Sequence, residues 1–346
     1  MTGEMGYMGE FKNKYNNYYN IAHSDLPPFP KTMLLETTNY CNHSCIFCSH
    51  AKMTRPKGFM DKELAFRIMK EAYGGGVLEI GFYMFGEPLL DKHLDEYIRY
   101  AKELGFTYTF VTTNGYLLDE EKMSSLIEAG LDSIKFSFNG GTKEHYLFAH
   151  GVDGFQRVKD NIITLSNYRE RKNKTFKIYI SSVLTQYTKD DGEEIRKQFE
   201  AAVDDILILE CHNQGGNMNY EIENALKISD SKNVHSEKGF CFMPFNRIHV
   251  TWEGYLTLCC VDYQNYLIIE DLNKMSLWDA WNSKRFREIR RRHLENRLEG
   301  TLCYNCLNNV NLEVKPLSEE YAYPYCCDTE KRMGVLQERI DRLLSK

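Results

Sequence analysis

Residues 33–48 read Met-Leu-Leu-Glu-Thr-Thr-Asn-Tyr-Cys-Asn-His-Ser-Cys-Ile-Phe-Cys, an apolar run followed at once by three cysteines. The first part, Met33–Thr37, is a short β-prone run of the kind that forms a buried strand. Cys41, Cys45 and Cys48 are then separated by three and two residues, a loop short enough to bring three thiolates onto one iron–sulfur cube. Because the cube has four irons, one iron keeps an open site that an amine and a carboxylate could chelate.

Zinc is the alternative occupant of this loop. A tetrahedral zinc site would use the same three cysteines with either His43 or His50 as the fourth ligand. Zinc more often binds pairs of cysteines that are two residues apart, so the spacing favours an iron–sulfur cluster.

Outward from the cysteine loop, short β-prone runs alternate with helical periodicity as far as Cys211. Such alternation predicts an α/β fold with parallel strands and helical crossovers. An open sheet with helices on both faces and a partial TIM-like barrel both fit it. One helix is expected to start at Asp91 and to end at Gly105. The expected strands are Met33–Thr37, Val77–Met84, Tyr108–Thr112, Ser133–Phe138, Phe176–Leu184 and Asp205–Glu210.

The pattern changes after a polar, glycine-containing run that follows Cys211. Arg247–Trp252 and Tyr255–Cys260 flank a Glu-Gly pair and predict an antiparallel hairpin. A helix is expected from about Ser276 to Leu294, with its basic stretch Lys284–Arg292 as a solvated face. An amphipathic helix is expected at the end of the chain. The expected parts are an N-terminal extension (1–30), a barrel (31–211), a linker (212–239), a small α+β domain (240–312) and a tail (313–346).

A second group of cysteines belongs to this C-terminal part. One precedes the hairpin, one follows it, and two form a C-x2-C pair much later in the chain. Together they supply four thiolates to one centre, either an iron–sulfur cluster or structural zinc. Cys260 is expected to be spare, because adjacent side chains on a strand point to opposite faces. The four expected ligands are Cys241, Cys259, Cys303 and Cys306.

Composition excludes several classes of protein. The 346 residues carry a net charge of −6, from 43 basic and 49 acidic side chains, unlike a general nucleic-acid binder. No apolar run reaches the ~18 residues of a membrane helix, and the N-terminus lacks a signal peptide's apolar core. Eleven cysteines in such a chain predict metal ligands in a reduced cytoplasm and not a disulfide scaffold. Cys326 and Cys327 are expected to be buried or free thiols.

The first cysteine loop resembles the signature of the radical S-adenosylmethionine (SAM) superfamily, with an aromatic residue, Phe47, before the third cysteine. Three later turns resemble that family in order: Phe85-Gly86-Glu87-Pro88, Thr113-Asn114-Gly115 and Ser137-Phe-Asn139-Gly140. Phe85 stands where relatives usually have glycine, and His150-Gly151 where they often have arginine and glycine. The resemblance implies a partial (β/α)6 barrel and a [4Fe-4S] cluster on Cys41, Cys45 and Cys48. It implies SAM contacts from Phe47, Gly86, Glu87, Pro88, Asn114, Ser137 and Asn139.

In that family, cleavage of SAM gives a 5′-deoxyadenosyl radical that abstracts a hydrogen atom from substrate. The second cysteine group is similar to the auxiliary-cluster region of the SPASM/twitch branch. No cysteine lies between Leu307 and Tyr325, so the shorter twitch form, with one auxiliary [4Fe-4S] cluster, is the better match. It resembles 2-deoxy-scyllo-inosamine dehydrogenase-type enzymes.

Four protein ligands leave the auxiliary cluster no open iron, so electron transfer is its remaining role. That favours oxidation of an alcohol to a carbonyl on a small polyol, sugar or aminocyclitol. An electron donor such as flavodoxin or ferredoxin is expected, and no nucleic-acid or membrane partner.

Three alternatives stay open. Cys211 ends the sixth strand, at the rim where barrel enzymes place their chemistry, and its thiol could return a hydrogen atom as in an epimerase. A small buried residue is the structural explanation of the same cysteine. A peptide-modifying enzyme is the second alternative, although residues 1–30 are too few for a fused leader-recognition domain. A non-catalytic iron–sulfur or zinc protein is the third, and the intact set of Cys41, Cys45, Cys48 and Glu87 argues against it.

Overall fold

The computed structural model describes residues 24–211, 241–308 and 310–323. Within these ranges the strands form one sheet in the order β6-β5-β4-β3-β2-β1-β7-β8-β9. Strands β1 to β6 are parallel to their neighbours, and β1 also pairs in parallel with β7. The barrel strands are β1 (Thr32–Leu35), β2 (Glu79–Phe82), β3 (Tyr108–Thr113), β4 (Ser133–Ser137), β5 (Lys177–Leu184) and β6 (Asp205–Glu210).

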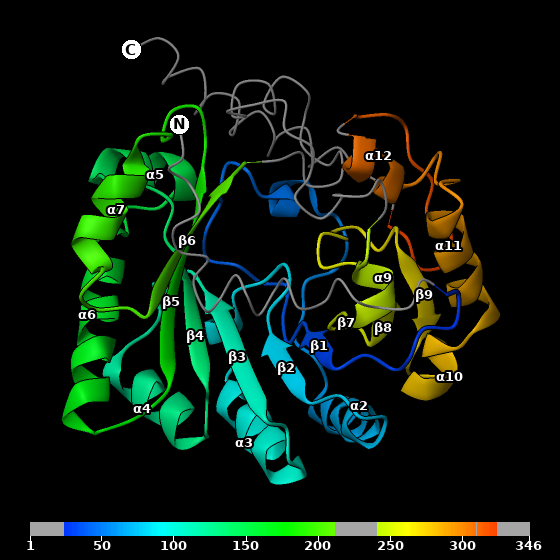
Figure 1. Ribbon diagram of the computed structural model, residues 1–346, viewed down its shortest axis with the longest axis horizontal. Coiled ribbons are helices and arrows are strands. Elements are labelled where there is room, and N and C mark those ends of the chain that lie inside the picture. Colours follow the sequence, from blue (N-terminus) through cyan, green and yellow to red (C-terminus); the bar gives the residue numbers. More distant parts are fainter. Residues whose placement is uncertain (1–23, 212–240, 309, 324–346) are drawn as a thin grey trace, which may run out of the picture.

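All six strands expected from the sequence are therefore present at the expected places. The sheet is curved and does not close on itself, and the crossover helices lie along its outer side (Figure 1). This is a partial barrel, and the open sheet with helices on both faces is excluded. The helices of this part are α2 (Lys62–Gly74), α3 (Leu94–Leu104), α4 (Glu120–Glu128), α5 (Lys143–His150), α6 (Phe155–Arg171) and α7 (Asp191–Phe199).

Helix α3 shows how the pattern sets the fold. Its apolar residues Leu94, Tyr97, Ile98 and Ala101 are all buried, and Gly105 ends the helix in the left-handed conformation with φ 107°. The expected start at Asp91 is wrong, because the helix is capped by His93. Asp91 instead ends the short 3-10 helix η2 (Pro88–Leu90), and its carboxylate accepts a hydrogen bond from the His93 backbone.

The C-terminal elements continue the same sheet. Strands β7 (Arg247–Val250) and β8 (Tyr255–Thr257) form the expected hairpin, and β9 (Ile268–Asp271), which was not expected, pairs with β8. The single helix expected from Ser276 to Leu294 is wrong. Two helices occupy this stretch, because the Ser283 hydroxyl accepts the Phe286 N–H and starts a new helix there. The helices here are α9 (Met243–Asn246), α10 (Leu277–Trp281), α11 (Lys284–Leu294) and α12 (Leu302–Asn308).

Helix α11 is not simply a solvated basic face. Arg290 is completely buried, with its guanidinium 4.1 Å from the Trp281 ring centroid and 3.6 Å from that of Phe286. It also donates hydrogen bonds to the Pro244 and Trp281 carbonyls, both at 2.9 Å. The expectation of a solvated helix is therefore wrong for this residue, which joins α11 to α9 and α10.

A buried ion cluster fastens the C-terminal elements to the barrel. The Arg55 guanidinium donates to both carboxylate oxygens of Glu36 at 2.7 and 2.9 Å, and to Glu253 at 2.8 Å. Arg55 also donates from Nε to the Tyr263 carbonyl. Glu36 follows β1, Arg55 follows the cysteine loop, and Glu253 lies in the turn of the β7–β8 hairpin. The cluster thus links three segments that are far apart in the sequence.

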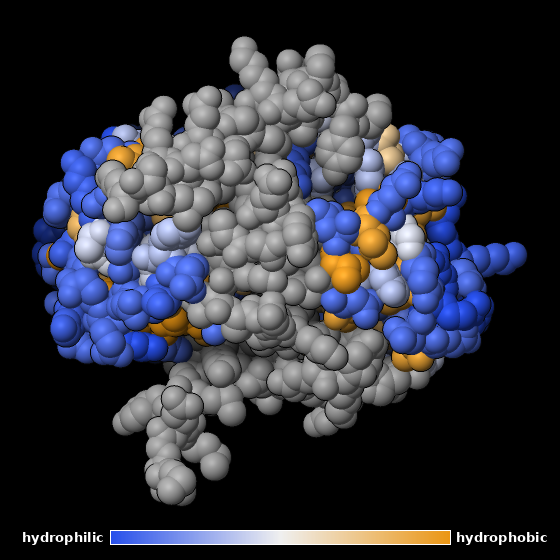
Figure 2. Space-filling view, turned by 90° about the horizontal axis from the view of Figure 1, so that it is seen from above, coloured by the Kyte–Doolittle hydropathy of each residue, from blue (hydrophilic) through white to orange (hydrophobic). Residues whose placement is uncertain are grey.

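The described surface is mostly hydrophilic on both flanks when it is viewed from above (Figure 2). Among the described residues, no helix combines the length and the apolar character needed to cross a membrane. The expected linker, the C-terminal amphipathic helix, Cys326 and Cys327 lie outside the described residues.

Candidate active site

The first cysteine loop is anchored to the end of helix α5 by backbone hydrogen bonds. The Ser44 N–H donates to the His150 carbonyl at 3.1 Å, and the Ile46 N–H donates to the Ala149 carbonyl at 2.9 Å. Cys48 then turns back, with its N–H on the Cys45 carbonyl at 3.1 Å. The loop leaves β1 and enters the 3-10 helix η1 (Ser49–Lys52), so it lies at the carboxyl ends of the parallel strands. Ligands of α/β folds bind at this edge.

The thiols of this loop fit a metal-bearing group. Burial raises the pKa of the Cys41 thiol to about 12, and the negative charge of Glu87 adds to this shift. Burial likewise raises the pKa of the Cys48 thiol. Thiols in this environment resist becoming bare thiolates, and a bound metal centre reverses that preference by supplying positive charge. The donor set therefore matches a thiolate-ligated cluster in chemistry.

Glu87 is held in place by the residues before it. Gly86 packs on the backbone that leads into the cysteine loop, and a Cβ there would overlap the Thr38 carbonyl oxygen. This close approach lets the Glu87 N–H donate to the Tyr40 carbonyl at 2.7 Å. Phe85, at the position where relatives have glycine, packs in a buried apolar group with Met53 and Tyr263. Its departure from the family pattern therefore serves packing and leaves the carboxylate in place.

The Glu87 carboxylate is buried and has only neutral donors among the described residues. It accepts hydrogen bonds from the Thr113 hydroxyl at 2.6 Å, the Asn114 N–H at 2.7 Å and the Leu89 N–H at 3.0 Å. Burial raises its pKa to about 7, despite these three donors. A buried carboxylate that lacks a cationic side chain fits an ammonium group supplied by a ligand.

The other expected SAM contacts are arranged around the same edge. Asn114 donates from its side chain to the Asn42 Oδ1 at 2.7 Å, which ties the turn after β3 to the cysteine loop. Asn139 is buried, and Ser137 is the half-buried last residue of β4. Pro88 begins the 3-10 helix η2 that follows Glu87.

Cys211 and Phe47 lie in one small apolar group. Its buried members include Ile46, Phe47, Phe148 and Cys211, from the cysteine loop, α5 and the end of β6. The Cys211 N–H continues the β5–β6 pairing through the Leu184 carbonyl at 2.8 Å. The structure thus brings the Cys211 side chain against the cysteine loop, although 170 positions separate them in the sequence (211 minus 41).

The four thiols expected at the second centre interact with one another. Burial raises the pKa of Cys241 to about 12, and the charge of Cys306 adds to this shift. Burial also raises the pKa of Cys303, helped by Cys241 and Cys306. The pKa of Cys259 is raised by a hydrogen bond with Cys260, by burial, and by the charges of Cys260 and Cys241. These shifts indicate that Cys241 is near both cysteines of α12 and near Cys259, which follows β8.

Cys260 is closer to this group than the sequence suggested. Cys259 and Cys260 both follow the end of β8 and lie in a turn, so strand alternation does not separate their side chains. The hydrogen bond with Cys259 lowers the pKa of Cys260 well below its usual value, and the neighbouring His249 contributes. A fifth thiol therefore belongs to the surroundings of the second centre.

Sequence reasoning did not select Asn42 or the buried ion cluster for the site, and it considered His43 only as a zinc ligand. Each makes its decisive contact with a residue on a distant segment. No spacing within the sequence signals such contacts.

Two family models match the chain, one over the barrel and one over the C-terminal elements. The model of the radical SAM superfamily matches residues 35–199. Residues 35–199 therefore form a radical SAM domain. A second family model, an iron–sulfur cluster-binding domain named SPASM, matches residues 241–307. This radical SAM protein therefore has a SAM-binding [4Fe-4S] cluster and an auxiliary iron–sulfur cluster, as expected for its branch.

Two curated relatives are similar to different extents. A probable GTP 3′,8-cyclase of Metallosphaera sedula is 31% identical over 181 residues, which cover 51% of this chain and 55% of that protein. The match thus spans only about half the length of the cyclase. The S-adenosyl-L-methionine-dependent 2-deoxy-scyllo-inosamine dehydrogenase of Niallia circulans is 24% identical over 296 residues, which cover 84% of this chain and 96% of that protein.

Solved structures share the fold. Streptococcus suis SuiB bound to S-adenosylmethionine has a TM-score of 0.64 at 17% identity, covering 83% of this chain and 73% of SuiB. BtrN in complex with AdoMet and 2-DOIA has a TM-score of 0.54 at 21% identity, covering 83% of this chain and 97% of BtrN. These likenesses establish the partial barrel of this radical SAM protein.

Replacing Glu87 by glutamine is expected to weaken SAM binding about tenfold, because the amide cannot neutralise an ammonium and turns a donor toward the Thr113 and Asn114 donors. Equilibrium dialysis with reconstituted protein measures this. Glu79→Gln is a suitable control, because Glu79 lies at the start of β2, far from the carboxyl edge. Unchanged SAM affinity in Glu87→Gln would contradict the assignment.

Proposed function

We propose that this chain is a radical SAM oxidoreductase that oxidises an alcohol to a carbonyl on a small polyol, sugar or aminocyclitol. The observation that carries the proposal is the second centre, where Cys241 before α9 interacts electrostatically with Cys259 after β8 and with the two cysteines of α12. The similarity to a named aminocyclitol dehydrogenase, over 84% of this chain, supports the same reaction class.

The proposed ligands follow from the two thiol groups. Cys41, Cys45 and Cys48 hold the SAM-binding cluster and leave one iron for the amine and carboxylate of SAM. Cys241, Cys259, Cys303 and Cys306 hold the auxiliary cluster without an open position. When bound, these groups supply a 5′-deoxyadenosyl radical and an electron acceptor.

The side chains at the carboxyl edge bind and orient SAM in this proposal. Glu87 pairs with the ammonium group, while the Thr113 and Asn114 donors keep its carboxylate directed at the site. Asn114 also fixes the cysteine loop through Asn42. Phe47 is buried beside Cys211 and excludes water from that side. The oxidation removes a hydrogen atom, an electron and a proton from the substrate, and the carbonyl forms when the last two leave.

A second candidate, a radical epimerase, is favoured by the position of Cys211. The thiol belongs to the apolar group that includes Ile46 and Phe47 of the cysteine loop, so it lies beside the proposed SAM site. There it could return a hydrogen atom to a substrate radical. Small buried cysteines also occur for packing alone, and the leading proposal treats Cys211 in this way.

Turnover in deuterated water separates the two reactions. For the oxidoreductase we expect a carbonyl product, no solvent deuterium on its carbon, and Cys211→Ala activity within about threefold of wild type, as for a packing substitution. Mass spectrometry of the product measures both properties. Solvent deuterium on carbon, with turnover abolished in Cys211→Ala while SAM is still cleaved, would establish the epimerase instead.

A substrate screen tests the proposal itself. Reduced, reconstituted protein is incubated with SAM and separate sets of polyols, aminocyclitols, sugars and peptides, and 5′-deoxyadenosine release is measured. We expect release to rise with an aminocyclitol, polyol or sugar, with equal amounts of carbonyl product. Relatives named PqqA peptide cyclase match 39% of this chain or less, which makes peptides the necessary comparison. Release only with a leader-bearing peptide would overturn the substrate class, and no SAM cleavage at all would favour a non-catalytic protein.

A further inference from the structure

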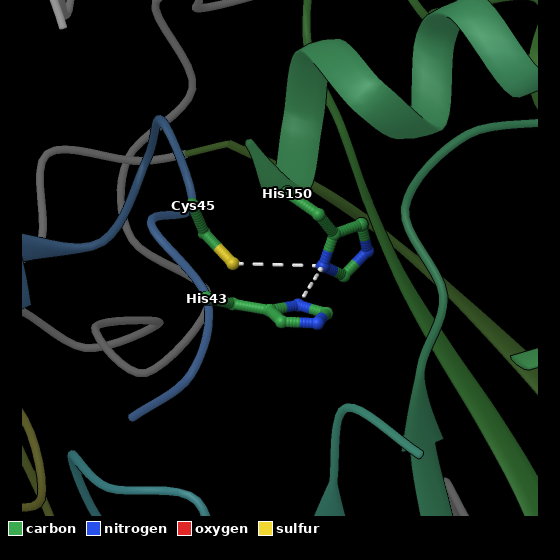
Figure 3. A group of neighbouring side chains, drawn as sticks. All are labelled: His43, Cys45 and His150. Atoms are coloured by element: carbon green, nitrogen blue, oxygen red, sulfur yellow. Dashed lines mark hydrogen bonds between the residues drawn. The ribbon is translucent and has the colours of Figure 1, made fainter. Parts of the chain in front are cut away.

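His43 and the half-buried Cys45 of the cysteine loop form a triangle with His150 (Figure 3). The His43 and His150 Nδ1 atoms are 3.2 Å apart, and the Cys45 Sγ is 3.6 Å from the same His150 nitrogen. Both histidines are buried, His150 completely. Cys45 and His43 belong to the loop, whereas His150 is the last residue of α5.

The contacts of the other His150 nitrogen fix where its proton is. The backbone N–H of Asn139 donates to His150 Nε2 at 3.1 Å, and a backbone N–H cannot accept. The Asn139 side-chain amide lies 3.2 Å from the same nitrogen. Nε2 is therefore an acceptor, and the neutral imidazole carries its proton on Nδ1.

His150 is held rigidly in that orientation. The Asn139 side-chain oxygen accepts the Val183 N–H at 2.6 Å, which fixes the amide that faces the ring. On its face, the imidazole stacks on Tyr146 with ring centroids 4.1 Å apart and an interplanar angle of 22°. The ring is thus held with its Nδ1 facing both the Cys45 sulfur and the His43 Nδ1.

We propose that His150 is a positioning residue for the SAM-binding cluster, whose Nδ1–H donates a hydrogen bond to the Cys45 thiolate. The inference rests on the proposed function, because it takes Cys45 as a cluster ligand. A hydrogen bond to a ligating sulfur draws negative charge from the cluster and raises its reduction potential. Radical formation requires the reduced cluster, so His150 makes the first electron easier to deliver.

The same proton on His150 Nδ1 accounts for the orientation of His43. His43 Nδ1 faces the same His150 Nδ1–H at 3.2 Å and shares it with the Cys45 sulfur as a second, neutral acceptor, so two unprotonated nitrogens do not face each other. The same three ligand atoms lie within 4.8 Å of one another, so a mononuclear metal is the competing occupant. In one arrangement Cys45 ligates the cluster, and in the other it ligates a single metal ion together with His43 and His150. Analysis of the bound metal separates the two arrangements.

The test is the midpoint potential of the SAM-binding cluster, titrated by electron paramagnetic resonance with and without SAM so that its signal is told apart from that of the auxiliary cluster. His150→Phe keeps the ring and removes both nitrogens, whereas His150→Asn places an amide donor near the Nδ1 position. In His150→Phe we expect a more negative midpoint potential, with about tenfold less reduced cluster at a fixed solution potential. In His150→Asn we expect the midpoint potential to recover in part. His145→Asn is the matched control on the same helix, since His145 pairs with Asp191 away from the loop.

The outcomes are distinguishable. An unchanged midpoint in His150→Phe that retains four irons at this site would overturn the inference and leave the proposed function intact. Wild-type protein that holds zinc and no SAM-responsive cluster would overturn the proposed function. If His150→Phe does not fold, wild-type protein with ¹⁵N-histidine decides: a weak ¹⁵N coupling to the reduced cluster, absent in His150→Asn, supports the bond, and absence of this coupling from wild type refutes it.

Discussion

Arg55→Met lowers the free energy of unfolding by about 3–5 kcal/mol, the cost of leaving a buried ion pair without one of its partners. Glu36 and the Arg55 side chain are completely buried, and Glu253 is almost so. Methionine fills much of the volume of arginine but offers no donor. Two carboxylates and the Tyr263 carbonyl then lose the hydrogen bonds that the guanidinium donates to them.

The physical reason for the size of this effect is the imbalance of charge. One guanidinium serves two carboxylates, and the pKa of Glu36 is raised because its burial outweighs the attraction of Arg55 and is reinforced by Glu253. Without Arg55, both acids must be protonated or exposed to water. Since the cluster links β1, the segment after the cysteine loop and the β7–β8 hairpin, we expect the C-terminal elements to separate from the barrel first.

Urea unfolding followed by circular dichroism measures this change. Arg99→Met is the control, because Arg99 is half-exposed and lies 3.7 Å from Asp95, a surface pair worth about 0.5 kcal/mol or less. A loss in Arg55→Met no larger than that of Arg99→Met would show that the buried cluster does not hold the two parts together.

Cys303→Ala/Cys306→Ala abolishes substrate oxidation while SAM cleavage persists. The two substitutions remove both thiolates contributed by α12, and two cysteines cannot close a four-iron cluster. The loss exceeds the ~10–100-fold cost of removing an outer-shell partner of a metal site, because the electron acceptor itself is lost. Carbonyl product and 5′-deoxyadenosine are quantified in the same reaction, so that the two activities are compared directly.

Cys259→Ala and Cys260→Ala refine this assignment. The thiols are adjacent and hydrogen-bonded, so the substitutions perturb the turn to a similar degree. We expect iron loss in Cys259→Ala and retention in Cys260→Ala. The reverse result would exchange the roles of the two cysteines, and retained oxidation in Cys303→Ala/Cys306→Ala would remove the auxiliary centre from the reaction.

Sequence periodicity sufficed for the barrel because each parallel strand and each crossover helix carries its own local signal. The apolar face of α3 and the strand Asp205–Glu210 are examples. Strand β9 was missed because its four residues are mostly buried and too few to show the alternation of a strand. The long helix after Ser276 was wrong because one hydroxyl cap at Ser283 outweighs continuous helical periodicity.

The candidate site, too, could be predicted from the sequence only in part. Cys41, Cys45, Cys48 and Glu87 lie in short motifs whose spacing carries the chemistry. The Asn139–His150 contact spans ten intervening positions, and the Arg55–Glu253 pair spans 197, so folding alone brings these partners together. Their roles follow from burial and hydrogen-bond direction, which a sequence does not display.

The most direct test of the account is the content of iron and sulfide per chain after anaerobic reconstitution, in wild type and in Cys41→Ala/Cys45→Ala/Cys48→Ala. Two four-iron clusters predict about eight irons in wild type and about four in the variant, with SAM cleavage lost. About four irons that fall to none, with zinc bound in both proteins, would make the second centre structural. The proposed alcohol oxidation would then have no electron acceptor in this chain.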